Sequence, residues 1–293
     1  MFMRVVVPSA LAVSLILAAG QSQKSIIVTV LDQAGAPVQG LTPADLAVVE
    51  DGATREVTDV KPAADPMTIA ILIDTTKATM GKEAPTRELR AALNAFVTTV
   101  QTASPQSAIG LWEFGGAGVM TQKPTVKTED LTKKINRIFP GQQPGGVLLE
   151  ALVDASKELS RKETGPRRVI LAISLNSPEV STIEPREVAL AMRKAGVSFW
   201  AVSISANADA TGSSQGNSAA RDLILENVTA ATGGERLTGV TAISLEKQVK
   251  SIADALTSQY VVTYARPAGV SAVTNIQAAS KKGMKALTAP WVQ

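Results

Sequence analysis

Residues 69–80 read IAILIDTTKATM, and this stretch decides the fold of the chain. Together with Met67 and Thr68 it lacks the alternation of a half-exposed strand, which is typical of a strand covered on both faces of a parallel sheet. The apolar run stops at Asp74, and hydroxyl and small residues follow at once. In open parallel sheets, ligands bind beyond the carboxyl ends of the strands. Asp74 is therefore a candidate metal ligand, a candidate catalytic carboxylate or a helix cap.

The chain that follows this strand alternates between strand and helix patterns. Further buried strands are predicted at RVILAISL, residues 168–175, and VSFWAVSI, residues 197–204, and a strand with a hairpin partner at residues 108–124. Apolar residues recur at helical spacing within residues 89–100, 131–138, 148–159, 188–195, 224–231 and 245–256. This order predicts an α/β fold with a doubly wound, mainly parallel sheet flanked by helices.

The segments on either side of this region have β character. Residues 26–63 contain a strand, a helix start at residues 42–45 and a hairpin bent around Asp51 and Gly52, and residues 260–267 and 273–280 return to strand patterns. One hairpin and one strand are not stable alone, so we expect the two ends to form a small β-sandwich-like domain. A floppy C-terminal tail is the alternative. The predicted boundaries are residues 1–20 for a signal peptide, 21–63 for the N-terminal β segment, 64–258 for the α/β domain and 259–293 for the C-terminal β segment.

Composition removes several classes of function. The 293 residues include no Cys and no His, which excludes disulfides, thiolate zinc sites, cysteine nucleophiles and the commonest general base. Any metal would be a hard cation bound by oxygen atoms. With 29 basic and 26 acidic residues and no dense Lys/Arg stripe, nucleic acid is not an expected partner. Lys77 beside the hydroxyls of the first loop could form a Ser–Lys arrangement, but nothing else supports one, and no catalytic residue is assigned.

The first twenty residues, MFMRVVVPSALAVSLILAAG, are typical of an export signal. Arg4 supplies the positive charge, residues 5–17 the apolar stretch, and residues 18–20 the small side chains needed for cleavage. The apolar run is short for a membrane span and contains Pro8, so cleavage is favoured over retention as an anchor. We therefore expect a secreted or periplasmic chain without a membrane span after cleavage.

Several of these features occur together in one known domain family. A buried strand ending in Asp-x-Thr, a long helix, the strand–hairpin pair AIGLWEFG and a Gly-Gly loop that opens a helix resemble a von Willebrand factor type A (VWA) domain. The chain is also similar to secreted bacterial proteins related to that domain. In those proteins a segment of the form VTVLDQAGAPVQGLTPADLAVVEDG precedes the domain, and a TGG…QYVVTYARP ending follows it. The resemblance covers residues 26–290 and implies a role in adhesion-type protein–protein interaction.

The resemblance also implies the position of a metal-ion-dependent adhesion site (MIDAS). In the family, five side chains on three loops bind magnesium or a similar ion. Asp74 and Thr76 match two of these ligands, whereas the other three positions carry Ala78, Val147 and Leu175, which have no side-chain oxygen. One carboxylate and one hydroxyl offer little to displace the tightly held waters of magnesium. We therefore expect a degenerate site with no metal and no cofactor, in which Asp74 and Thr76 are vestigial.

The favoured function is a non-enzymatic, extracytoplasmic module that binds an unknown protein partner. The binding face would be formed by residues 74–79, 143–147, 175–180 and 205–218. Its predicted contact residues are Asp74, Thr76, Lys77, Gly145, Gly146 and Asn176. Two alternatives remain. A one-residue shift of the third loop would offer Asn176 as a neutral oxygen ligand, with Glu179 nearby, and would leave a VWA adhesion domain dependent on magnesium or manganese. A hydrolase on a doubly wound sheet would need a nucleophile and a base that the sequence does not identify.

Overall fold

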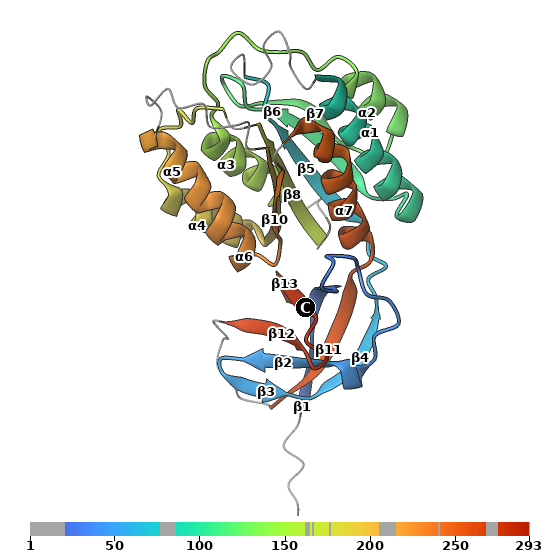
Figure 1. Ribbon diagram of the computed structural model, residues 1–293. Coiled ribbons are helices and arrows are strands. Elements are labelled where there is room, and N and C mark those ends of the chain that lie inside the picture. The colour runs from blue at the N-terminus through green and yellow to red at the C-terminus, as the bar shows by residue number, and fades with distance from the viewer. Residues whose placement is uncertain are drawn as a thin grey trace, which may run out of the picture.

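The computed structural model describes residues 21–76, 86–161, 165, 167–175, 177–204, 215–239, 241–267 and 275–292. In this part of the chain an α/β domain lies on top of a smaller β domain (Figure 1). The α/β domain contains a six-stranded sheet in the order β10-β9-β8-β5-β6-β7. Its strands are β5 (Met67–Ile73), β6 (Ala108–Glu113), β7 (Val119–Thr125), β8 (Arg167–Ser174), β9 (Val197–Ile204) and β10 (Arg236–Gly239). All neighbours pair in parallel except β6 and β7, which form an antiparallel hairpin.

Helices cover both faces of this sheet. On one face lie α1 (Thr86–Ala103), α2 (Thr128–Ile135) and α7 (Leu245–Thr257), and their apolar side chains pack on Ile69, Ile71 and Ile73 of β5. On the other face lie α3 (Leu148–Leu159), α4 (Pro185–Ala195) and the π-helical turn η2 (Ile224–Val228), which pack on Ala70 and Leu72. The turn η2 joins α5 (Gln215–Leu223) to α6 (Thr229–Ala231).

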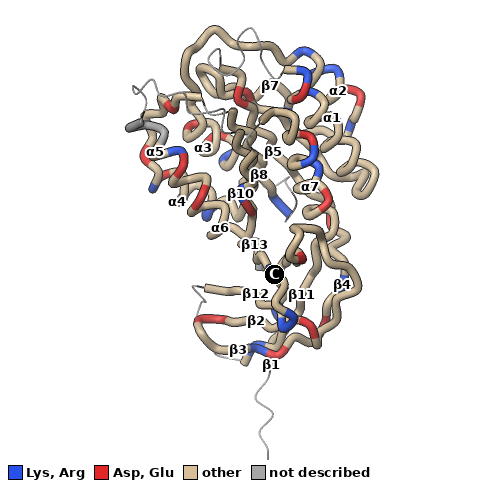
Figure 2. The backbone as a smooth tube through the Cα atoms, viewed as in Figure 1, with Lys and Arg blue, Asp and Glu red and all other residues tan. Residues whose placement is uncertain are grey.

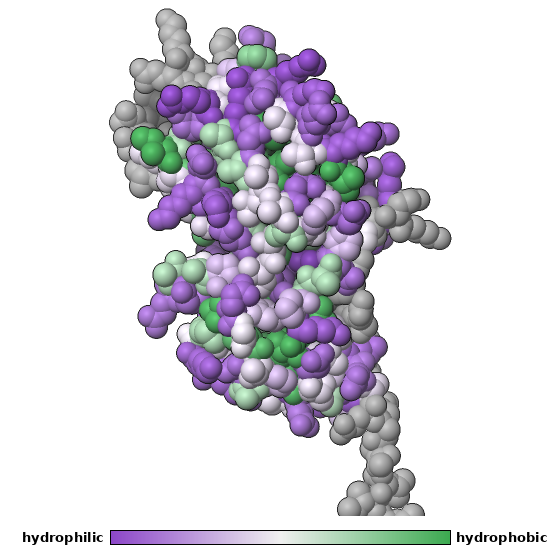
Figure 3. Space-filling view, turned by 90° about the vertical axis from the view of Figure 1, so that its right-hand side faces the viewer, coloured by the Kyte–Doolittle hydropathy of each residue, from purple (hydrophilic) through white to green (hydrophobic). Residues whose placement is uncertain are grey.

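The double cover explains the sequence of β5. Successive side chains of a strand point to opposite faces, and here both faces are core, so all seven residues of β5 are apolar or buried. The outer surface on the side of α1, α2 and α7 is mostly hydrophilic, with scattered apolar patches (Figure 3). None of the helices in the described residues is both long and apolar enough to cross a membrane.

The β domain is built from strands near both ends of the described chain. One sheet has the order β13-β1-β11-β4, and the other has the order β12-β2-β3. The strands are β1 (Gln21–Leu31), β2 (Leu46–Glu50), β3 (Ala53–Arg55), β4 (Val57–Pro62), β11 (Tyr260–Pro267), β12 (Ile276–Ser280) and β13 (Lys285–Val292). Apolar side chains from both sheets form one core, which includes Ile26, Val28, Leu46, Val48, Val262 and Tyr264. The predicted fold class is therefore confirmed: a doubly wound, mainly parallel sheet with a small β-sandwich-like domain from the N- and C-terminal strands.

Local sequence signals account for the turns. Asp51 has φ 46° and Gly52 has φ 85°, the left-handed pair that a tight two-residue hairpin turn requires. The 3₁₀ turn η1 (Pro43–Asp45) begins where it was predicted, and the Asp45 carboxylate accepts hydrogen bonds from the Thr42 N–H at 2.9 Å and the Thr42 hydroxyl at 2.8 Å. Two strands, β10 and β13, were not predicted from the sequence.

Candidate functional site

Four loops of the α/β domain meet beyond the carboxyl ends of its parallel strands. They are residues 74–76 after β5, which we call the first loop, residues 114–118 after β6, residues 138–147 before α3, which we call the second loop, and residues 175 with 177–184 after β8, which we call the third loop. The short turn η3 (Ala242–Ser244) follows β10 toward the same side of the sheet. We call this side, at the top of Figure 1, the carboxyl edge.

Asp74 is fully buried at the centre of this edge. One carboxylate oxygen, Oδ1, accepts hydrogen bonds from the Thr76 N–H at 3.1 Å and the Thr76 hydroxyl at 2.9 Å. The other, Oδ2, accepts from the Leu175 N–H at 3.0 Å. Thr76 is also fully buried. The carboxylate therefore holds the first loop in a turn and ties it to the third loop, and neither Thr76 nor Leu175 belongs to a helix.

The first loop, the loop at residues 114–118 and the second loop interlock through their backbones. The Gly141 N–H donates to the Thr75 carbonyl at 2.6 Å, and the Val147 N–H donates to the Phe114 carbonyl at 2.9 Å. A methyl group on Gly115 would lie 2.5 Å from the Thr75 carbonyl carbon, so only glycine fits at this crossing. The glycine residues in this region thus serve close packing between loops.

Gly145 and Gly146 likewise allow the second and third loops to pack closely against each other. The Gly146 N–H donates to the Pro178 carbonyl at 2.8 Å, and the Val180 N–H donates to the Gly146 carbonyl at 2.9 Å. A methyl group on Gly145 would lie 2.6 Å from Val180 Cγ1, and one on Gly146 would lie 3.0 Å from the Phe114 ring. Both glycines are buried.

Glu179 closes the connection between the third loop and α3. It is 3% exposed, and its Oε1 accepts hydrogen bonds from the Leu148 N–H at 3.2 Å, the Ser181 N–H at 3.2 Å and the Ser181 hydroxyl at 2.5 Å. Leu148 is the first residue of α3, so the carboxylate satisfies one of the open N–H groups of that helix. Burial raises the pKa of Glu179, and its hydrogen bonds and the Arg221 charge oppose that rise.

Arg221 supplies a buried positive charge behind the third loop. Its guanidinium is 4% exposed and donates to the Ser177 carbonyl, and its Nε lies 3.5 Å from the Asp222 carboxylate. The loops that an ion would bridge in a metal-binding VWA domain are therefore bridged here by protein groups. Asp74 joins the first loop to the third, Glu179 joins the third to α3, and Arg221 anchors the third to α5.

The residues of this edge do not fit a MIDAS ion. Both oxygens of Asp74 accept hydrogen bonds from protein donors, and Val147 is the residue before α3 with no oxygen to offer. Leu175 is 4% exposed and belongs to the core cluster under α1 and α7, so its side chain points away from an ion position. In the described part of the chain no three or more carboxylates lie close enough together to hold a metal.

The structure places the predicted contact residues unequally. Asp74, Thr76, Gly145 and Gly146 lie together at the carboxyl edge but are buried, and they hold the loops in contact with one another. Lys77 and Asn176, and residues 205–214 of the predicted binding face, lie outside the described residues. Glu179 and Arg221 were not among the predicted contact residues of the favoured hypothesis. The only sequence signal for Glu179 was an acidic residue in the loop after a buried strand.

Three large apolar side chains are exposed at the carboxyl edge, together with polar side chains such as Gln142, Gln143 and Thr182. Phe139 is 62% exposed, Val119 53% and Val180 49%, and Phe139 rests on the Arg90 guanidinium, 4.7 Å from ring centre to Cζ. Gly118 beside Val119 lies against Val147, and Gly145 lies against Val180. We call Val119, Val147 and Val180 the valine strip. Residues 114–118 and 138–147 contain no Lys, Arg, Asp or Glu (Figure 2).

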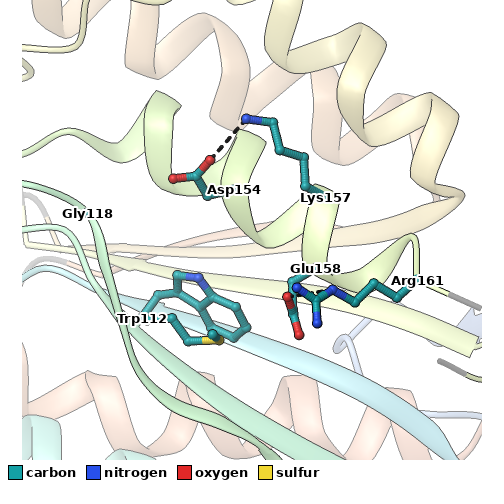
Figure 4. Close-up of a pocket in the computed structure, with 7 residues that line it drawn as sticks. Trp112, Gly118, Asp154, Lys157, Glu158 and Arg161 are labelled. Atoms are coloured by element: carbon teal, nitrogen blue, oxygen red, sulfur yellow. Dashed lines mark hydrogen bonds and ion pairs between the residues drawn. The ribbon is translucent and has the colours of Figure 1, made fainter. Parts of the chain in front are cut away.

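A groove of about 350 Å³ lies to one side of this edge, between α3 and the β6–β7 hairpin. Figure 4 shows Trp112 on its floor and Asp154, Lys157, Glu158 and Arg161 along the helix wall. Asp154 pairs with Lys157 at 3.2 Å and Glu158 with Arg161 at 3.0 Å, so the charges of the wall largely satisfy each other. Trp112 is 2% exposed and packs as a core residue, as expected from the strand pattern. The groove contains none of the predicted contact residues.

Comparison with solved structures identifies the architecture. The proximal thread matrix protein 1 from the mussel byssus matches 67% of this chain and 50% of its own, with 14% identity and a TM-score of 0.52. A structure of the same protein with a zinc-occupied MIDAS motif matches 71% and 49%, with 14% identity and a TM-score of 0.51. The VWA domain of SpRpn10 matches 63% and 95%, with 12% identity and a TM-score of 0.47.

These matches concern the fold rather than the sequence. The chain spans about half the length of the byssus protein that it matches. No family model matches the chain, and no curated protein sequence matches it. The strand order, the helices on both faces and the structural matches together show that the α/β domain has the VWA fold.

Proposed function

We propose that this chain is a non-enzymatic, extracytoplasmic module that binds another protein through the carboxyl edge of its α/β domain, with no metal ion in the contact. The fold supports a binding role by analogy only, because one fold serves many functions. The argument for this chain therefore rests on the chemistry of the edge itself.

The observation that carries the proposal is a group of exposed apolar side chains at the carboxyl edge. Val119, Val180 and Phe139 are exposed there, and the loops at residues 114–118 and 138–147 contain no charged residue. The cores of protein interfaces are depleted in charged residues and enriched in apolar and aromatic ones, and exposed apolar groups that cluster mark contact sites. A partner with an apolar, uncharged contact surface is the best match for these side chains.

The metal-free part of the proposal is supported by what the ligand positions do. Asp74 is already saturated with protein donors, and Leu175 is packed into the core. An ion would have to break these hydrogen bonds and then find oxygen ligands that Val147 and Leu175 do not supply. The zinc site of the byssus protein is a property of that protein.

The other parts of the proposal rest on the sequence. The absence of His and Cys supports a non-enzymatic role, and the export signal at residues 1–20 supports an extracytoplasmic location. The exported protein should have an intact mass that corresponds to a start near Gly20 or Gln21, and a panel of ester, amide and phosphate substrates should show no turnover. Retention of Met1 in a membrane fraction would contradict the location, and saturable turnover would contradict the non-enzymatic role.

A capture experiment with matched variants tests the binding site. Purified mature chain is immobilised, exposed to native envelope extract in magnesium or in EDTA, and compared with Val180→Asp and with Leu190→Asp. Leu190 is the control because it is 55% exposed but lies on α4, away from the carboxyl edge. We expect the same partner to be captured with and without magnesium, to be lost with Val180→Asp by about tenfold or more, and to be retained with Leu190→Asp. Capture that requires magnesium, or equal loss with both variants, would contradict the proposal.

A further inference from the structure

The chain passes between its two domains twice. The first crossing, residues 63–66, leads from β4 of the sandwich into β5 of the α/β sheet, and the second, residues 258–259, leads from α7 into β11. Both crossings lie at the amino end of the parallel sheet, opposite the carboxyl edge (Figure 1). They run side by side, since the Ala63 N–H donates to the Gln259 carbonyl at 2.8 Å.

Arg167, the first residue of β8, contacts both crossings at once. Its Nη1 donates to the carbonyl of Ala63 at 3.2 Å and to that of Asp65 at 2.5 Å. Its Nη2 donates to the carbonyl of Leu256 at 2.9 Å and to the side-chain oxygen of Gln259 at 2.8 Å. One guanidinium thus gathers acceptors from the end of β4, from the start of β5 and from the end of α7.

This arginine is held by neutral acceptors rather than by a direct ion pair. It is 5% exposed, and burial lowers its pKa to about 10, an effect that the charge of Asp65 partly offsets. A buried charge is tolerated only where hydrogen bonds replace its lost hydration. Four acceptors at the junction do so for Nη1 and Nη2, while Nε is buried without a hydrogen-bond partner among the described residues. Separating the crossings would therefore leave the remaining part of a desolvated charge without partners.

Three further contacts join the same two domains. The Gln259 side-chain amide donates to the Thr29 hydroxyl of β1 at 3.0 Å. Lys285 of β13 pairs with Glu235 before β10 at 2.6 Å. Gly233 has φ 67°, and a methyl group there would overlap the Thr288 carbonyl of β13. Gly233 of the TGG sequence therefore lets β13 pack closely against the α/β domain, whereas its neighbour Gly234 lies against Phe199 of β9.

We propose that Arg167 is a latch that locks the two crossings together, so that the β sandwich and the α/β domain behave as one rigid unit. The carboxyl edge is then held in a fixed direction relative to the sandwich at the other end of the molecule. The structure assigns Arg167 this role because, within the described residues, only the Arg167 side chain forms hydrogen bonds to both crossings. The latch is independent of the proposed binding function.

A neighbouring arginine provides the matched control. Arg168 is the second residue of β8 and donates to two carbonyls, those of Ala195 at 2.8 Å and Gly165 at 3.2 Å. Both carbonyls lie in the α/β domain. Arg167→Met and Arg168→Met are compared with wild type by scanning calorimetry. We expect wild type and Arg168→Met to unfold in one cooperative transition, and Arg167→Met to unfold in two, because the domains no longer melt together.

Hydrogen exchange locates the change. In Arg167→Met, amides of residues 60–66 and 256–262 should exchange about tenfold faster or more, since hydrogen bonds to a charged group contribute at least one factor of ten to an opening equilibrium. Amides of α3 and α4 should be unchanged. Arg167→Lys is the second variant if the Met variant does not fold, because a lysine keeps the charge but cannot reach acceptors on both crossings. Two transitions in wild type, or equal effects of the Arg167 and Arg168 variants, would overturn the latch.

Discussion

Both carboxylate oxygens of Asp74 accept hydrogen bonds from protein groups, and one of those donors belongs to a loop about a hundred residues further along the chain. At the scale of single residues, this carboxylate therefore holds two distant loops together. The Glu179 carboxylate likewise accepts a hydrogen bond from the first residue of α3 and ties the third loop to that helix. The two acids together stabilise the loops that carry the valine strip.

Asp74→Ala tests this structural role. The variant removes the charged acceptor of three hydrogen bonds from Thr76 and Leu175 in a buried site, so we expect a loss of about 3 kcal/mol or more in the free energy of unfolding. The loss should be the same in magnesium and in EDTA, as measured by urea denaturation. Asp32→Ala is the control, because Asp32 accepts two backbone hydrogen bonds at 2.8 and 2.9 Å in an exposed turn, where about 1 kcal/mol is expected. A magnesium-dependent stability in wild type that Asp74→Ala abolishes would show a working ion site.

Glu179→Gln tests the buried carboxylate through pH. Because the pKa of Glu179 is raised in the folded protein, the folded state binds the proton more tightly than the unfolded state. The stability contributed by Glu179 is therefore largest at low pH and falls as pH rises from the ordinary glutamate value, about 4.3, to the raised value. We expect the difference in unfolding free energy between wild type and Glu179→Gln to fall across this window and to be constant above it. A difference that grows with pH would mean that the folded-state pKa is lowered instead.

The sequence indicated that Asp74 and Thr76 follow a buried strand, but it did not indicate the contact between Asp74 and Leu175, for a physical reason. An acid at the end of a buried strand is a local signal, readable from a single stretch. The burial of Leu175 depends on how the third loop passes over the core, and the contact from Glu179 to Leu148 joins residues 31 positions apart. Contacts of this kind follow from the packing of the whole domain and leave no pattern in either segment alone.

At the scale of elements, the long and strongly periodic segments were predictable and the short ones were not. The strand β5 and helices such as α1 and α7 have uninterrupted apolar patterns. The strand β10 has only four residues, and β13, which reads KALTAPWV, contains a proline and few β-branched residues. Both depend on pairing with a stronger neighbour, β9 and β1 respectively. Tertiary pairing overrode weak intrinsic propensity in these two strands.

The close contact between β13 and Gly233 makes a prediction at this scale. Gly233→Ala combines an unfavourable left-handed φ with a steric overlap against Thr288, whereas Gly283→Ala has a similar φ of 71° and nothing within 4 Å. The left-handed conformation alone costs about 1 kcal/mol. We expect Gly233→Ala to lower the free energy of unfolding by at least about 2 kcal/mol and Gly283→Ala by about 1 kcal/mol. Urea denaturation of both variants measures the difference, and equal losses would mean that β13 moves freely away from Gly233.

At the scale of the whole molecule, the split β domain joins the two ends of the described chain. The prediction rested on an energetic argument rather than on a motif: residues 26–63 contained too few strands to bury their own apolar faces. The structure supplies the missing strands from the other end, with β11 and β13 on either side of β1 and β12 beside β2. The residue that locks this arrangement to the α/β domain, Arg167, was unpredictable, since it precedes an ordinary buried strand and its acceptors are 89 to 104 positions away.

Deletion of residues 268–293 tests the dependence of the N-terminal strands on this tail. The deletion removes β12 and β13 but keeps β11, so β1 loses one of its two neighbours and β2 loses its pairing with β12. The unpaired edges and the uncovered core side chains should open far more often, and protease cleavage within residues 26–61 should rise by about tenfold or more. Cleavage within residues 86–161 is the internal control, because these residues belong to the α/β domain, which keeps its whole sheet and both helical layers. Limited proteolysis followed by mass spectrometry of the fragments distinguishes the two regions. An unchanged cleavage rate in residues 26–61 would mean that the first strands hold their fold without the tail, and an equal rise in both regions would mean that the deletion unfolds the entire chain.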